Sequence, residues 1–136
     1  MALLFVEHIG IAVAHLEEAV TRYTKLLGVP PYAEEEVPSE GVKTVFFRCG
    51  SHKIELLGAL HQNSPIAKFL AKRGEGVHHI AYRSSDIRAD MVRLKNEGFQ
   101  LLSEEPRPGA ENMWVCFVHP RDCQGVLTEL CQPREE

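Results

Sequence analysis

The feature that most constrains this fold is an internal repeat. A short apolar run with a histidine just inside it occupies residues 6–13, and a closely matching run occupies residues 76–83. The two histidines, His8 and His79, are 79 − 8 = 71 residues apart, which is about half of the 136-residue chain. Self-similarity on this scale indicates a duplicated structural unit.

The segments that follow each histidine repeat as well. Residues 16–27 show apolar positions at helical spacing and end at Gly28, and residues 86–97 do the same and end at Gly98, with Asp86 as the expected N-cap. Both halves then pass through a polar segment into β-type sequence. The further strands are expected at residues 33–37, 42–48, 52–57, 113–118 and 126–130. Each half is therefore predicted to run strand, helix and about three strands.

The connecting segments are polar. Residues 28–41 and 103–112 are predicted to be surface loops, the first with a short strand, and the acidic triplet at residues 34–36 is expected to form a solvated face. Between the halves, residues 63–74 are predicted to form a bridging helix. It would have a polar N-cap and Pro65 in its first turn, and it would end at Gly74.

Composition limits the classes of function. At 44% hydrophobic residues the chain can bury a core, and it is too short for two ordinary independent domains. A net charge of −4 without a basic stripe argues against nucleic acid as a partner. No apolar run suits a membrane span, and the start of the chain lacks the pattern of a signal peptide, so we expect a cytoplasmic protein with no membrane partner. The four cysteines show no C-x-x-C pairing and are expected to be reduced thiols.

The residues suited to chemistry follow the repeat. The last strand of each half carries one carboxylate among apolar neighbours, Glu55 and Glu129. Burying a carboxylate without a partner is costly, so such groups are normally paired or bound to metal. With His8 and His79 they offer two imidazoles and two carboxylates, an N₂O₂ set that would leave two open positions on an octahedral divalent cation. The alternative is two buried His–Glu salt bridges without metal.

On these residues the sequence resembles the methylmalonyl-CoA epimerases, a family of the vicinal oxygen chelate superfamily. The first-strand histidine and the module order are shared across the superfamily, whereas the bridging segment and the chain ending are more specific. The matching segments are residues 8–13, 54–57, 64–70, 76–82 and 119–130.

The resemblance implies an α+β fold of two tandem βαβββ modules, which form an open curved sheet around a metal site. The whole chain, residues 1–136, would be one domain. Its first module would span about residues 4–58, the bridging helix about 63–74, and the second module about 76–132. The resemblance also suggests a homodimer.

The resemblance implies an isomerase that interconverts (2R)- and (2S)-methylmalonyl-CoA through an enolate, with assistance from a metal. His8, His79 and Glu129 fall on the family's ligand positions, and Glu55 falls where members carry glutamate or glutamine. The ion would be divalent, with cobalt expected in vitro and manganese, nickel, zinc or iron as alternatives. His78 should point to the other face of its strand and be structural.

The proton-transfer groups and the coenzyme contacts are less well defined. Glu129 could act partly as a base, and Thr44 stands where some bacterial members carry a glutamate, so one base is left unassigned. Glu40, Lys43 and Glu111 are neighbouring candidates. Lys68 and Lys72 on the bridging helix are predicted to contact the phosphates of CoA, with Arg73 and Arg107 as further candidates.

Three alternative functions are compatible with the same fold. A lactoylglutathione lyase (glyoxalase I)-like isomerase would need a glutathione pocket. An extradiol dioxygenase would use two histidines and one glutamate on iron and leave Glu55 without a role. A metal-free small-molecule binding protein would not need the four ligands.

Overall fold

The computed structural model describes residues 2–135, and the first and last residues of the expected domain lie outside this range. The chain forms two compact units. The N-terminal unit is residues 8–78, and the C-terminal unit combines residues 79–135 with 2–7. The element order is β1 (Phe5–Ala12), α1 (Leu16–Leu27), β2 (Ala33–Val37), η1 (Pro38–Glu40), β3 (Val42–Cys49), β4 (His52–Ala59), α2 (Pro65–Arg73), β5 (Gly76–Arg83), α3 (Ile87–Asn96), β6 (Arg107–Gly109), η2 (Ala110–Asn112), β7 (Met113–Val118), η3 (Pro120–Cys123) and β8 (Leu127–Pro133).

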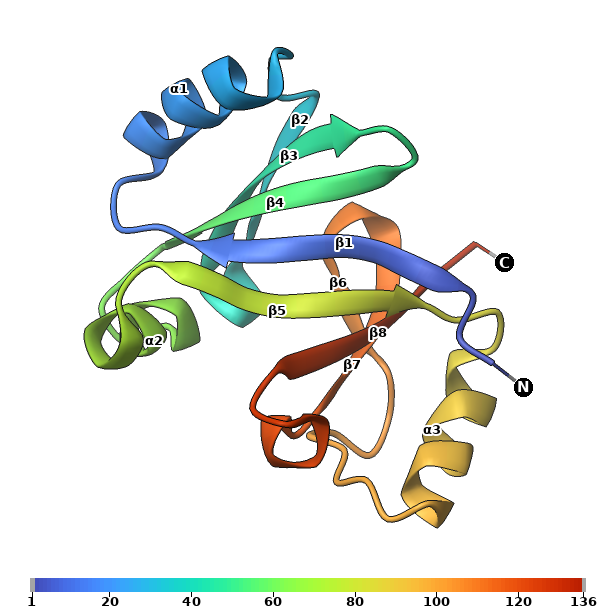
Figure 1. Cartoon of the computed structure of the whole chain (residues 1–136). Coiled ribbons are helices and arrows are strands. Elements are labelled where there is room, and N and C mark those ends of the chain that lie inside the picture. The colour runs from blue at the N-terminus through green and yellow to red at the C-terminus, as the bar shows by residue number, and fades with distance from the viewer. Residues whose placement is uncertain (1, 136) are drawn as a thin grey trace. The chain divides into compact units, whose positions relative to one another are not determined.

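In the N-terminal unit the strands follow the order β2-β3-β4-β1 (Figure 1). Strand β1 runs parallel to β4, whereas β3 is antiparallel to both β2 and β4. Helix α1 packs against one face of this sheet, where Val45, Phe47 and Leu56 are buried. Because successive side chains of a strand alternate between faces, Thr44, Phe46 and Glu55 belong to the opposite face.

Helix α1 begins and ends where the sequence predicted. Its apolar stripe supplies the residues that cover the sheet, and Gly28 ends it with a left-handed φ of 77°. A residue with a Cβ would be strained in that conformation, which is why the glycine is a reliable stop signal. The stripe consists of Leu16, Ala19, Val20, Tyr23 and Leu27.

The C-terminal unit repeats this arrangement with strand order β5-β8-β7-β6. Strand β5 runs parallel to β8, and β7 is antiparallel to β8 and β6. Helix α3 covers one face through Ile87, Met91 and Leu94, which pack against Cys116, Val118 and Leu130. The predicted cap is confirmed, because the Asp86 side chain accepts a hydrogen bond from the amide of Ala89 at 3.1 Å.

The bridging helix α2 is also confirmed, and it belongs to the N-terminal unit. The Ser64 hydroxyl caps it by accepting from the amide of Ala67 at 3.1 Å, and Pro65 occupies its first turn. The sequence prediction was wrong for residues 103–112, which are not entirely loop. Residues 107–109 pair with β7 as the short strand β6, which their own mixed polarity does not predict.

Two further predictions, about the cysteines and about membrane-spanning helices, can be compared with the structure. All four cysteines are free thiols, as expected. No helix within residues 2–135 combines the length and the apolar character needed to cross a membrane.

Candidate metal centre

The N-terminal unit buries one histidine and one glutamate against each other. His8 lies in β1 and Glu55 in β4, and their exposed fractions are both 6%. The parallel register places Glu55 opposite Gly10, two residues beyond His8, so both side chains lie on the face away from α1. Glycine leaves room beside the carboxylate, and His8 Nδ1 lies 3.2 Å from Glu55 Oε2.

The C-terminal unit builds the same pair in the same way. Glu129 of β8 is opposite Ala81 of β5, two residues beyond His79, and the exposed fractions of Glu129 and His79 are 6% and 5%. His79 Nε2 lies 3.1 Å from Glu129 Oε1. Both pairs thus use a parallel strand contact, a small residue opposite the acid, and the sheet face that the helix leaves uncovered.

The repeat extends to an aromatic residue that sequence reasoning missed. Phe46 of β3 is opposite Glu55, and Phe117 of β7 is opposite Glu129. The two phenylalanines are 117 − 46 = 71 residues apart, the same offset as the histidines, and this offset was the available signal. In the C-terminal unit Phe117 meets the His79 ring edge to face, with centroids 5.8 Å apart and an interplanar angle of 89°. This contact limits the freedom of the His79 ring.

These pairs suit a divalent transition ion chemically. A buried carboxylate needs a compensating partner, and each pair supplies one nitrogen and one oxygen donor of the kind that zinc, cobalt, nickel, manganese and iron accept. The histidine of a ligand pair must be neutral to bind metal, whereas a salt bridge would need it protonated. The residues therefore fit a metal site as well as the metal-free alternative.

Thr44 lies on the same sheet face as Glu55. Its register partner in β4 is Leu57, two residues beyond Glu55, and only 2% of its surface is exposed. The position therefore faces the site side of the N-terminal unit, as expected for a group near the chemistry. A threonine hydroxyl, however, is far too weak a base to take a proton from carbon at neutral pH.

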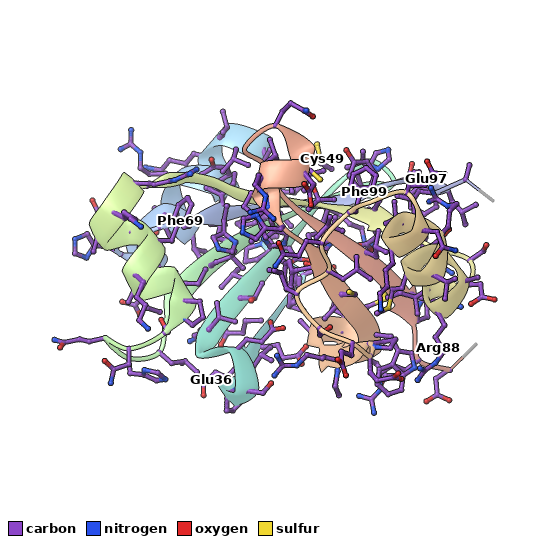
Figure 2. All side chains as sticks on the ribbon, turned by 90° about the horizontal axis from the view of Figure 1, so that it is seen from below. Glu36, Cys49, Phe69, Arg88, Glu97 and Phe99 are labelled. Atoms are coloured by element: carbon purple, nitrogen blue, oxygen red, sulfur yellow. The ribbon has the colours of Figure 1, made fainter. Side chains whose placement is uncertain are left out.

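The other predicted residues lie at the surface or in packing contacts. Lys68 and Lys72 are exposed one turn apart on α2, a spacing that puts both ammonium groups on one side of the helix. His78 packs edge to face on Phe69 of α2, with ring centroids 4.9 Å apart (Phe69 is labelled in Figure 2). A packing contact with the helix is what a structural His78 requires.

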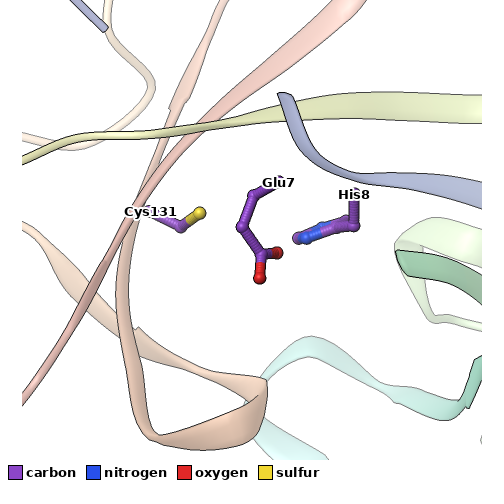
Figure 3. A group of neighbouring side chains, drawn as sticks. All are labelled: Glu7, His8 and Cys131. Atoms are coloured by element: carbon purple, nitrogen blue, oxygen red, sulfur yellow. The ribbon is translucent and has the colours of Figure 1, made fainter. Parts of the chain in front are cut away.

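Another buried carboxylate of the C-terminal unit, Glu7, was not predicted. Glu7 precedes His8 in the chain, is 7% exposed, and has a carboxylate oxygen within 4.8 Å of Cys131 Sγ. In Figure 3 the Cys131 thiol points toward the Glu7 side chain. The thiol also lies 3.6 Å from the Tyr82 carbonyl oxygen. A glutamate in a strand of mixed residues gives no sequence signal of burial, because the strand pattern alone does not say which segments flank it.

Comparison with known proteins identifies the relatives of this chain. It is 44% identical over 92% of its length to the ethylmalonyl-CoA/methylmalonyl-CoA epimerase of Cereibacter sphaeroides, 95% of which is covered. The methylmalonyl-CoA epimerase of Mycobacterium tuberculosis has a similar structure, with a TM-score of 0.92 and 38% identity over 96% of this chain and 89% of that one. A methylmalonyl-CoA epimerase in complex with methylmalonyl-CoA and NH₄⁺ gives a TM-score of 0.93 at 36% identity, covering 97% of this chain and 96% of that one.

The family match agrees with these relatives and with the two His–Glu pairs. Residues 7–117 match the family described as Glyoxalase/Bleomycin resistance protein/Dioxygenase superfamily, a span that includes His8, Glu55 and His79. The chain belongs to the Glyoxalase/Bleomycin resistance protein/Dioxygenase superfamily.

Proposed function

We propose that this protein is a methylmalonyl-CoA epimerase, an isomerase that interconverts the 2R and 2S forms of its substrate. The observation that carries the proposal is the pair of matching His–Glu contacts, 3.2 and 3.1 Å long, in a chain similar over nearly its whole length to epimerases. Removal of the C2 proton creates negative charge beside a carboxylate that is already negative, so the site must stabilise an enolate.

The four residues of the two pairs, His8, Glu55, His79 and Glu129, are proposed to hold one divalent ion. Bound there, the ion would act as a Lewis acid toward the thioester and carboxylate oxygens of the substrate and stabilise enolate charge. This arrangement presupposes two tandem βαβββ modules that form an open curved sheet around the ion, within one domain. Two observations support it: the register is the same in both pairs, and the chain belongs to the Glyoxalase/Bleomycin resistance protein/Dioxygenase superfamily.

The chain's own residues then orient the substrate and move protons. Glu129 is proposed as the group that holds the proton on one side of C2, because its carboxylate is buried and held by His79. Phe46 and Phe117 would help to exclude water from the sheet faces that carry the His–Glu pairs, since each is the register partner of a glutamate. Thr44 would lie on the same sheet face and would not act as a base.

Lys68 and Lys72 are proposed to receive the phosphates of CoA. They are exposed on the same side of α2, and Arg73 beside them stands over the Phe69 ring at 5.9 Å. Three cations on one helix of a chain with net charge −4 form a local basic surface suited to an acidic coenzyme.

A homodimer is also proposed, and light scattering during gel filtration would measure the oligomeric state.

The decisive experiment is exchange of the C2 proton of methylmalonyl-CoA in D₂O, followed by proton NMR. Metal-stripped protein should be inactive, and addition of Co²⁺ should restore exchange and interconversion of the epimers. Glu55→Ala and His79→Ala should both lose the cobalt-dependent activity, whereas Glu34→Ala on the exposed side of β2 should keep it. A fully metallated wild-type protein that exchanges no deuterium would refute the proposal.

Further assays on the same protein preparation distinguish the alternative functions of this fold. Turnover of a glutathione hemithioacetal would indicate a glyoxalase I-like isomerase, and oxygen uptake with a catechol would indicate an extradiol dioxygenase. Absence of stoichiometric metal at saturating Co²⁺ would indicate a metal-free binding protein.

A further inference from the structure

The edge strand β2 presents one of its three consecutive glutamates to the sheet face that carries the His8–Glu55 pair. Glu35 is the register partner of Thr44, and Thr44 is in turn opposite Leu57, two residues from Glu55. Register partners in a sheet lie on the same face, as do residues two apart in a strand. Glu35 therefore shares a face with Thr44 and Glu55.

Its two neighbours lie on the other face. Glu34 is opposite Val45, which packs under α1, and its carboxylate pairs with Lys43 at 3.6 Å. Glu36 is opposite Lys43 and exposed (labelled in Figure 2). Glu35 alone of the three is half-buried. The expectation that residues 34–36 form a solvated face holds for Glu34 and Glu36 and is wrong for Glu35, because the strand turns that side chain to the other face of the sheet.

The distances allow Glu35 to act with the metal pair. Strand β2 is two strands from β4, and adjacent strands are about 4.8 Å apart, so the backbones of Glu35 and Glu55 are about 10 Å apart across the strands and about 7 Å along them. Two glutamate side chains that lean toward each other over this span leave a gap the size of a small acyl group. Such a gap is what a carboxylate needs to reach a carbon that is held near Glu55.

We propose that Glu35 is the second proton-transfer residue of the epimerase, which rests on the function proposed above. Inversion at C2 requires one group on each side of the enolate plane. The Glu35 carboxylate takes the C2 proton of one epimer, the C–H electron pair enters the enolate, and a second acid delivers a proton from the opposite side to form the new C–H bond. The reverse direction starts at that second group and ends with proton delivery from Glu35, and solvent exchange resets both groups.

The repeat supports this division of labour. Arg107 is opposite Val115 in the C-terminal unit, and Val115 corresponds to Thr44 because 115 − 44 = 71. The position equivalent to Glu35 is therefore an arginine, which cannot accept a proton. Of the two edge strands, β2 alone therefore supplies a carboxylate on the face of the His–Glu pair of its own unit.

Glu35→Gln tests the proposal against a matched control in the same triplet, Glu36→Gln. Each variant, loaded with Co²⁺, is given the 2R and the 2S epimer separately in D₂O, and initial C2 exchange is measured for each by NMR. In Glu35→Gln, we expect exchange of one epimer and the rate of epimerisation to fall by about 10²- to 10⁴-fold, the usual range for a general base. Exchange of the other epimer should stay near the wild-type rate, which also shows that the variant is folded. Glu36→Gln should match the wild type for both epimers.

Three results would overturn the proposal. Wild-type exchange of both epimers in Glu35→Gln would exclude Glu35 from proton transfer. An equal loss for both epimers would assign it a structural or positioning role, and a reduced shift of thermal midpoint by Co²⁺ would show that role directly. A metallated wild type without exchange would refute the epimerase function itself and the role of Glu35 with it, so the two failures are distinguishable.

Discussion

Removing the charge from each buried glutamate in turn tests whether the two His–Glu pairs are equivalent. In Glu55→Gln and Glu129→Gln the side chain keeps its shape and exchanges a charged acceptor for a neutral one. A hydrogen bond to a charged group contributes about 1.5–3 kcal/mol to stability and a neutral one about 0.5–1.5 kcal/mol. Because the two pairs have nearly the same length, 3.2 and 3.1 Å, and the glutamates the same 6% exposure, each variant should lose about 1–1.5 kcal/mol without metal.

For a chain of this length 1 kcal/mol shifts the thermal midpoint by about 4 °C, so both midpoints should fall by about 4–6 °C. Calorimetry of chelator-treated protein measures this. The activity losses should differ, because Glu129 is also the proposed proton-transfer group. At saturating Co²⁺, kcat of Glu129→Gln should fall by about 10²- to 10⁴-fold, and that of Glu55→Gln by much less. Unequal midpoints without metal would contradict the equivalence of the pairs, and a larger kcat loss in Glu55→Gln would contradict the role of Glu129.

Three other predictions concern residues outside the pairs. Charge reversal of Lys68 and Lys72 together should raise KM for the CoA thioester and leave kcat unchanged in steady-state kinetics, whereas Lys95→Glu on α3 should change neither. His78→Ala should cost about 1 kcal/mol of stability through loss of its ring contact with Phe69, and should leave Co²⁺ affinity, measured by calorimetric titration, at the wild-type value. Burial raises the pKa of the Cys116 thiol above its ordinary value of 9.0, although the Ser103 hydrogen bond opposes this. The folded state therefore holds the thiol proton more tightly than the unfolded state does. This stabilisation is complete below pH 9 and is lost as the pH rises further. Cys116→Val should therefore flatten the plot of unfolding free energy against pH above pH 9.

The sequence was informative wherever one local pattern carried the information. Helix α1 was predicted to the residue, since a 3.6-residue apolar stripe is closed by Gly28 in a left-handed conformation. The N-cap Asp86 was predicted from its side-chain chemistry, and the polar cap expected at the start of the bridging helix is Ser64. The residues of both His–Glu pairs were identified because the duplication presents each of them twice.

Pairing across strands set the limit of that reasoning. The three residues of β6 form a strand only because β7 is beside them, and nothing in their own pattern predicts it. The acidic triplet of β2 looked uniform because its alternation has meaning only once the strand has a register.

The sequence by itself therefore determined the repeated order of helices and strands, and the four residues most suited to bind a metal. The tertiary structure alone decided which nitrogen of each histidine meets its glutamate, that a phenylalanine stands opposite each acid, and that Glu35 faces inward while Glu34 and Glu36 face outward. The physical reason is range. Helical periodicity and capping are settled within a few residues of chain, whereas the face and neighbours of a strand residue are fixed by partners far away in sequence.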